Sequence, residues 1–151
     1  MLPKLRKYRG FTLVELLVVI VILAILAAIV VPKFMDSRRR SKEAALKSTL
    51  QLLRDANERM KNDTGVYCQN LSDLAASTAP AQGYVDTGLG HGWSLGAITA
   101  SDWHGPYIAT VPNDPVSGTA FNWNSNWTGA NNAIYSSASG NGLDGTAYNT
   151  W

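Results

Sequence analysis

The chain has 151 residues, is 46% hydrophobic and 16% charged, and carries a formal net charge of +2. This average hides an asymmetry: all 13 Lys and Arg residues lie at or before Lys61, whereas residues 62–151 contain six Asp and no Lys or Arg. The length suits one modest domain. The cations stand beside an apolar segment, which indicates membrane phospholipid rather than nucleic acid as their counterpart. Cys68 is the sole cysteine, which excludes an internal disulfide and a cysteine metal cluster.

A basic segment and then an apolar segment open the sequence. Residues 1–10 contain four cations, and residues 11–31, FTLVELLVVIVILAILAAIVV, contain Glu15 as their only charge. As a helix the apolar stretch spans about 32 Å, close to the hydrocarbon thickness of a bilayer. It is longer than the apolar region of a secretory signal peptide. The pattern therefore predicts a membrane-spanning helix.

A second helical pattern follows from Lys33 to about Asn62, and Gly65 predicts its end. Pro32 lacks a backbone donor and crowds the carbonyl of Ala28, so we expect a kink or local melting there. Apolar residues recur at three- and four-residue steps and predict one buried stripe: Ala45, Leu46, Thr49, Leu50, Leu53, Ala56 and Met60. The charged residues between them predict a solvated face: Glu43, Lys47, Arg54, Asp55, Glu58, Arg59 and Lys61.

After Gly65 helical periodicity is lost, and Gly, Ser, Thr, Asn and aromatic residues dominate. Short apolar stretches at 107–109, 120–123 and 133–135 are separated by Pro and Gly, which predicts a small antiparallel sheet with long loops. The expected fold class is α+β, with a long N-terminal helix packed on this sheet. The expected divisions are a leader, a membrane helix, an amphipathic helix and a polar head, at residues 1–10, 11–32, 33–62 and 63–151.

Glu15 is the unusual residue of the apolar stretch. A carboxylate inside a bilayer costs about 2.5–3.5 kcal/mol on insertion-based scales, so it needs a partner. Within residues 11–31 the sequence offers none. Cleavage after Gly10 would create a positive amine on Phe11, four residues before Glu15. An ammonium on one chain would then neutralise Glu15 on a neighbour in a helix bundle of low dielectric constant.

At these residues the sequence resembles the type IV pilin superfamily, which includes type IV pilins and the pseudopilins of type II secretion. The resemblance rests on the basic leader, Gly10, Phe11, Glu15, the apolar stretch and Pro32. It implies cleavage after Gly10 by a prepilin peptidase that also N-methylates Phe11. It further implies contact between Glu15 and the Phe11 amine of an adjacent subunit, and loosening of the helix at Pro32 in the fibre. An assembly ATPase and an inner-membrane platform protein are the further partners that it implies.

The head also resembles the major pseudopilin of type II secretion, at residues 60–67, 105–108 and 111–115 and at Gly118. Those pseudopilins carry a C-terminal calcium loop with several Asp ligands. The corresponding segment here is 137–145, where Ser replaces one of those Asp residues at position 139 and Asp144 is the sole carboxylate. Calcium takes six to eight oxygen ligands. Asp144 and Asn141 are thus the candidate calcium ligands, and a glycine-rich surface loop is the alternative.

The aromatic residues of the head admit two interpretations. Five Trp and several Tyr could stack sugars or bases, but residues 62–151 lack the cations that nucleic acid requires, so packing of the sheet and of subunit contacts is preferred. The spacing of polar residues suggests no catalytic triad or carboxylate pair, so the chain is not expected to be an enzyme. The sequence therefore predicts a structural, major subunit of a type IV pilus-like filament, held in the inner membrane before assembly and displayed outside the cell afterwards. The alternatives are a type II secretion pseudopilin and a single-pass anchored glycan-binding module.

Overall fold

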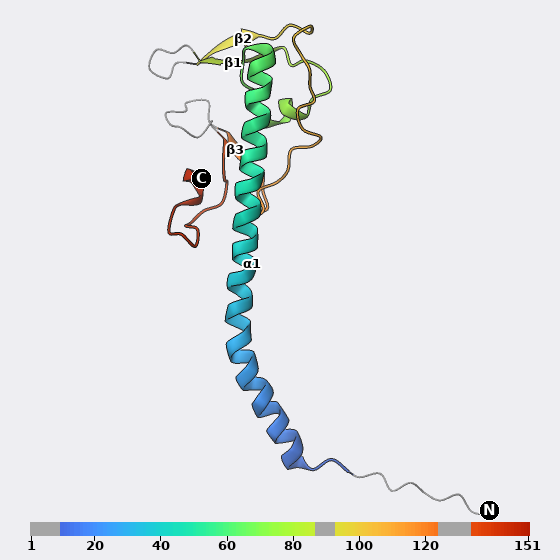
Figure 1. The fold of residues 1–151 in the computed structure, drawn as a ribbon, viewed down its shortest axis with the longest axis vertical. Helices are drawn as coiled ribbons and strands as arrows, with labels where there is room; N and C mark the ends of the chain where they lie inside the picture. Colours follow the sequence, from blue (N-terminus) through green and yellow to red (C-terminus); the bar gives the residue numbers. More distant parts are fainter. Residues whose placement is uncertain (1–9, 87–92, 124–133) are drawn as a thin grey trace, which may run out of the picture. The chain divides into compact units, whose positions relative to one another are not determined.

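The structure is a computed structural model that describes residues 10–86, 93–123 and 134–151. The predicted leader lies almost wholly outside these residues. The chain divides into two compact units, Met1–Arg39 and Arg40–Trp151. One long helix, α1, extends from Leu13 to Thr64 and contributes to both units (Figure 1). The remainder of the second unit consists of short strands, two 3-10 helices and loops.

The ends of α1 follow from local chemistry. Thr12 immediately precedes the first helical residue, and Gly65 ends the helix with a φ of 77° and an N–H that donates to the Lys61 carbonyl at 2.8 Å. A positive φ costs glycine little, so Gly65 suits this position. The helix continues without interruption through Pro32. The local melting expected there is therefore absent from this conformation, whereas loosening in a fibre stays a prediction.

The predicted buried stripe of α1 is confirmed at Leu46, Leu50, Leu53, Ala56 and Met60. Two predicted members differ, because Ala45 is exposed and Thr49 is only half-buried.

Glu43 and Asn57, which are both buried, complete the stripe instead. The placement of Glu43 on the solvated face was wrong. It lies three residues before Leu46, a spacing that puts both side chains on the same helix face. Its Oε1 accepts hydrogen bonds from the Leu143 N–H at 3.0 Å and from the Tyr148 hydroxyl at 2.8 Å. These donors satisfy a carboxylate that would otherwise be costly to bury.

Two small antiparallel pairs of strands confirm the predicted fold class. β1 (Gln82–Asp86) pairs with β2 (Trp93–Ala97), and β3 (Asn122–Trp123) pairs with β4 (Ile134–Tyr135). Figure 1 shows these segments alongside the C-terminal half of α1. Gly83 of β1 packs so closely on the Val66 side chain and the Tyr67 carbonyl that an added Cβ would overlap both.

The strand expected at 107–109 is not formed. The backbone N–H groups of Tyr107 and Ile108 both donate to the Leu74 carbonyl, at 2.9 and 3.1 Å. Leu74 belongs to the 3-10 helix η1 (Leu71–Ala75). These two donors are therefore used by a helix end and cannot join a strand ladder.

The core of the second unit lies between α1 and the loops. Its buried apolar residues come from the helix, from the segment after it and from the strands and C-terminal loop: Leu46, Leu50, Leu53, Ala56, Met60, Val66, Cys68, Leu71, Leu74, Ile108, Phe121, Ile134, Ala138 and Tyr148. Cys68 is fully buried, and this burial raises the pKa of its thiol far above the ordinary value. A neutral thiol of this kind is unreactive.

Asp114 is a buried anion that connects two loops. Its Oδ1 accepts from the N–H groups of Val116 at 2.7 Å and Ser117 at 3.3 Å. Its Oδ2 accepts from the Ser136 hydroxyl and from the Ser137 N–H at 3.1 Å. Both oxygens are thus satisfied by donors from the 111–119 loop and from the segment that follows β4, so the carboxylate holds these two parts of the head together.

Candidate functional site

Glu15 lies in the first turn of α1 and is paired with Thr12. The Thr12 backbone N–H and hydroxyl each donate to Glu15 Oε2 at 2.8 Å, and the Glu15 N–H donates to Thr12 Oγ1 at 3.2 Å. This reciprocal arrangement is a capping box, which satisfies backbone donors that a helix start otherwise leaves unpaired. The capping box was not predicted from the sequence, although Thr-x-x-Glu before an apolar run is its signature. Glu15 therefore has a role within its own chain that is independent of any neighbour.

The predicted cleavage position lies just outside the helix. Gly10 is exposed, its φ is not positive, and a side chain there would meet no atom within 4 Å. Local packing thus gives no reason for glycine at this position. Phe11 is 74% exposed. Pro32 is 17 residues further along α1 than Glu15, or about 26 Å at the usual helical rise, so the structure does not bring it together with the other predicted assembly residues.

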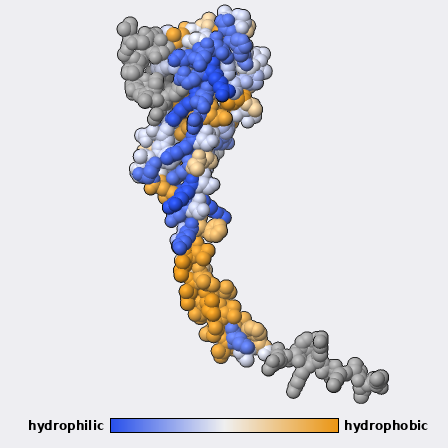
Figure 2. Space-filling view, in the orientation of Figure 1, coloured by the Kyte–Doolittle hydropathy of each residue, from blue (hydrophilic) through white to orange (hydrophobic). Residues whose placement is uncertain are grey.

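From Leu13 to Val31 the helix of the first unit is apolar on all sides, apart from Glu15. Between Phe11 and Met35, 18 large apolar side chains are exposed. Figure 2 shows one side of this stretch, which is hydrophobic almost without interruption. Among the described residues one helix is long and apolar enough to cross a membrane by length and composition, and none of its most apolar window is buried within the chain. A soluble core helix would bury one face, so this surface is suited to lipid or to other helices.

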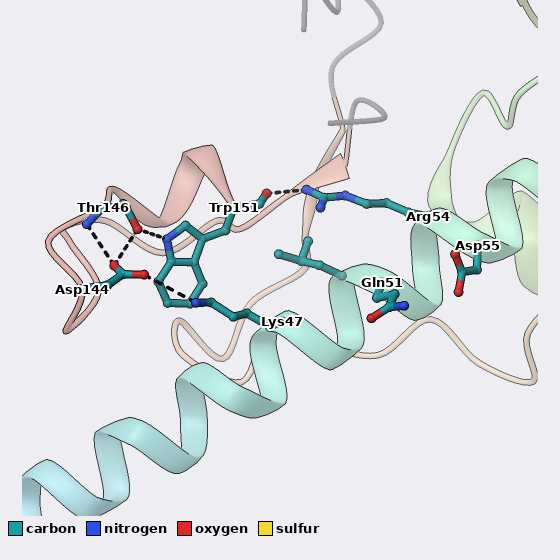
Figure 3. A pocket seen from close by; sticks show the side chains of 8 residues that line it. Lys47, Gln51, Arg54, Asp55, Asp144, Thr146 and Trp151 are labelled. Carbon is teal, nitrogen blue, oxygen red and sulfur yellow. Dashed lines mark hydrogen bonds and ion pairs between the residues drawn. The ribbon is translucent and has the colours of Figure 1, made fainter. Parts of the chain in front are cut away.

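The C-terminal loop of the second unit is held on α1 by charged side chains (Figure 3). The Lys47 ammonium lies 3.4 Å from Asp144 Oδ2 and 4.1 Å from the centre of the Trp151 ring. The Arg54 guanidinium donates to the main-chain oxygen of Trp151 and, at 2.9 Å, to that of Ile134. A pocket of about 470 Å³ lies between α1 and this loop, lined by Lys47, Leu50, Gln51, Arg54, Asp55, Asp144, Thr146 and Trp151.

The donor set around Asp144 does not suit a calcium ion. Its Oδ1 already accepts from the Thr146 hydroxyl at 2.6 Å and from the Thr146 N–H at 3.0 Å, while the Lys47 ammonium faces Oδ2. Hydrogen bonds from Thr146 and the neighbouring Lys47 lower the pKa of Asp144. Among the described residues, no three His, Cys, Asp or Glu side chains gather as metal ligands. Calcium at Asp144 and Asn141 thus stays a prediction that this geometry does not support.

The aromatic side chains of the head pack on one another. Ring pairs in edge-to-face contact join Tyr67 with Trp93, Trp103 with Tyr107, and Tyr148 with Trp151, at centroid distances of 5.1–5.6 Å. Such pairs stabilise a core beyond the area they bury. Trp127 lies outside the described residues. The ring pairs account for these side chains as packing elements, so they add no support to a glycan-binding module.

Comparisons with known proteins found matches to the N-terminal segment and to most of the chain. A sequence model of the prokaryotic N-terminal methylation motif matches residues 5–31. Over 114 residues the chain is 32% identical to the type II secretion system core protein G of Escherichia coli (strain K12), covering 72% of this chain and 75% of that protein. The core protein G of Vibrio cholerae is 28% identical over 111 residues, or 74% of this chain and 76% of that protein.

A type IV pilin is also similar. The type IV major pilin protein PilA of Myxococcus xanthus is 34% identical over 75 residues, which is 50% of this chain but only 33% of that pilin. The chain thus spans about a third of the length of this relative. None of these three relatives is named as an enzyme. No solved structure matches the chain at a comparable level of significance.

A methylation motif, an exposed apolar helix and a small head packed on the same helix define a class of membrane-anchored filament subunits. The chain belongs to the type IV pilin superfamily, which contains both pilins and secretion pseudopilins.

Proposed function

We propose that the chain is the structural, major subunit of a type IV pilus-like extracellular filament. A prepilin peptidase removes residues 1–10 by cutting after Gly10 and methylates the new amine of Phe11. Residues 11–32 first anchor the subunit in the inner membrane and then form the filament core. Residues 33–62 support the head, and residues 63–151 form the outer surface. An assembly ATPase and an inner-membrane platform protein supply the work of extraction.

The observation that carries this proposal is the apolar surface of the helix between Phe11 and Met35. Removing a large apolar side chain from water contributes on the order of 1.5–3 kcal/mol, so 18 exposed side chains cannot stay in water. Lipid covers them in the single subunit. In a filament the same surfaces pack against the helices of other copies. The apolar area thus stays out of water throughout, and assembly exchanges one apolar environment for another.

We infer that Glu15 sets the position of each helix along its neighbour in this packing. Removal of the leader places an ammonium on Phe11, next to the Thr12–Glu15 capping box. The amine of one copy then neutralises Glu15 of its neighbour, while Thr12 continues to hold the carboxylate in position. A carboxylate in an apolar bundle is costly without such a partner, so the pairing favours one position of each helix against the next.

The capping box allows the two roles of Glu15 to be separated by mutation. Gln also serves at the third position of a capping box, so Glu15→Gln removes the charge and keeps the cap. Thr12→Val removes the hydroxyl, and with it two of the three capping hydrogen bonds, and keeps the charge. If charge pairing directs assembly, Glu15→Gln lowers the amount of subunit in filaments about tenfold or more, equivalent to about 1.4 kcal/mol. Thr12→Val then stays near wild type.

Filaments are sheared from the cells, and immunoblotting measures the amount of each variant in the sheared and membrane fractions. Asp36→Asn, which removes an exposed carboxylate from the same helix, is the matched control. Wild-type incorporation of Glu15→Gln would refute the pairing. A defect in Thr12→Val equal to that in Glu15→Gln would assign the effect to the helix cap instead. Mass spectrometry of the purified subunit tests the processing step, for which we expect a methylated Phe11 as the first residue.

The second candidate is the major pseudopilin of a type II secretion system. It is favoured by the similarity to two core proteins G, which extends over about three quarters of each chain. Both candidates use the same stalk, so deletion of the gene discriminates them by phenotype. Loss of long surface fibres with normal secretion supports the pilus. Loss of secretion from cells that never carried long fibres supports the pseudopilus.

A further inference from the structure

A shallow groove lies on one face of α1, where the proposed membrane segment, residues 11–32, ends. It has a volume of about 290 Å³ and is lined by Val30, Val31, Phe34, Met35 and Arg38. Residues three and four apart face the same side of a helix, so these side chains form one strip. Its apolar part is at the N-terminal end and its single cation is at the C-terminal end. We call this strip the exit groove.

The exit groove stays apolar at Phe34 and Met35, where the proposed span has already ended. Phe34 and Met35 are 62% and 68% exposed, although both follow Pro32. The exposed cations Lys33, Arg38 and Arg39 stand in the same stretch. An apolar floor with cations beside it matches a ligand that has an apolar tail and an anionic head.

We propose that the exit groove binds an anionic phospholipid, with an acyl chain on Phe34 and Met35 and the phosphate on the Arg38 guanidinium. Guanidinium groups bind phosphate oxygens through paired hydrogen bonds. The site continues the apolar surface of residues 11–31, so a lipid of the surrounding membrane reaches it without leaving the bilayer. This inference rests on the proposed function, because it requires a subunit anchored in a membrane.

In the membrane-anchored subunit, before assembly, charge favours lipid over a second helix as the occupant. Asp36 is two positions from Arg38, and such a spacing places side chains on different sides of a helix. A neighbouring copy packed on the exit groove through its residues 11–31 would bring Glu15 as its only carboxylate. That carboxylate already has a partner in the filament we propose. The guanidinium would then lose water without gaining a counter-charge, whereas a phospholipid supplies one.

The test is native mass spectrometry of the full chain, extracted from membranes in a neutral detergent. Dioleoylphosphatidylglycerol is titrated into the micelles, and dioleoylphosphatidylcholine serves as the neutral lipid. Wild-type chain should retain the anionic lipid in preference to the neutral one. A basic residue near a membrane surface contributes about 1 kcal/mol, so Arg38→Gln should weaken retention about five-fold. Arg38→Lys should keep part of the preference, and Arg59→Gln, the same change on an exposed part of α1 in the other unit, should keep all of it.

Equal retention of the two lipids, or an Arg38→Gln chain that binds like wild type, would overturn the proposal. Lipid-free dimers that Arg38→Gln dissociates would overturn it as well, because a second copy would then occupy the exit groove. Fractionation separates this failure from failure of the proposed function. A chain found outside the membrane fraction contradicts the function itself, whereas a membrane-bound chain without lipid preference contradicts only the exit groove.

Discussion

Replacing Asp114 with Asn removes a buried negative charge and leaves the size of the side chain almost unchanged. In the wild-type chain the two carboxylate oxygens share donors from Val116, Ser117, Ser136 and Ser137. Asn keeps one oxygen as an acceptor. Its NH₂ group replaces the second oxygen and faces the two donors that this oxygen had bound. Two bonds to a charged acceptor are then lost, at roughly 1.5 kcal/mol each, so we expect the free energy of unfolding to fall by about 3 kcal/mol.

Urea unfolding of the full chain in detergent measures this loss. All five tryptophans lie between Trp93 and Trp151, so tryptophan fluorescence reports on the head alone. With a slope near 2 kcal/mol/M, the midpoint of Asp114→Asn should fall by about 1.5 M. Asp55→Asn, which removes an exposed carboxylate, should change the free energy of unfolding by less than about 0.5 kcal/mol. Equal midpoints for the two variants would show that the buried carboxylate does not hold the loops.

The effect should also depend on pH. Burial alone would raise the pKa of Asp114, but the hydrogen bonds from Ser136 and from the N–H groups of Val116 and Ser117 outweigh burial and lower the pKa. The unfolded chain therefore takes up the proton more readily than the folded chain. The stabilisation is complete above the unfolded-state pKa of about 3.9 and is lost as the pH falls through the lower folded-state pKa. The difference between wild type and Asp114→Asn should therefore narrow below about pH 4.

Two further predictions use the same unfolding assay. Leu50→Ala should lower the free energy of unfolding by about 2–5 kcal/mol, because Leu50 is buried in the core. Leu52→Ala, at a position 51% exposed, should lower it by less than about 0.5 kcal/mol. Similar losses for the two variants would contradict the assignment of the buried face of α1. Calcium chloride and EDTA should leave the wild-type midpoint unchanged, because Lys47 already faces the Asp144 carboxylate; a rise with calcium would restore the predicted metal site.

Sequence periodicity was sufficient to predict burial where the position of a side chain on its own helix decides whether it is buried. Leu46, Leu50 and Leu53 are buried as predicted, since helical spacing fixes which face they share. Gly65 ends the helix for a similarly local reason. The capping box at Thr12 is local as well, and the spacing Thr-x-x-Glu before an apolar run was sufficient to predict it.

Features that depend on distant partners were not predictable. Glu43 is buried because the Leu143 N–H and the Tyr148 hydroxyl reach it from about one hundred residues away. Strand β1 contains Gly83, a weak strand former, and gains its place from close packing on Val66. Tyr107 has the sequence character of a strand residue, but its N–H is taken by Leu74. In each case a tertiary contact outweighed the local preference.

Three charged residues of α1 in the second unit form contacts within the chain, although the sequence predicted a solvated face for them. Glu43, Lys47 and Arg54 each bind the C-terminal part of the head, through Tyr148, Asp144 and Trp151 respectively. The residues that follow β4 are thus fastened to the helix at several points by polar contacts that need no metal ion. Because Leu50 of the same helix packs in the core of this unit, the C-terminal part of the head is held on α1 by polar contacts and by apolar packing together.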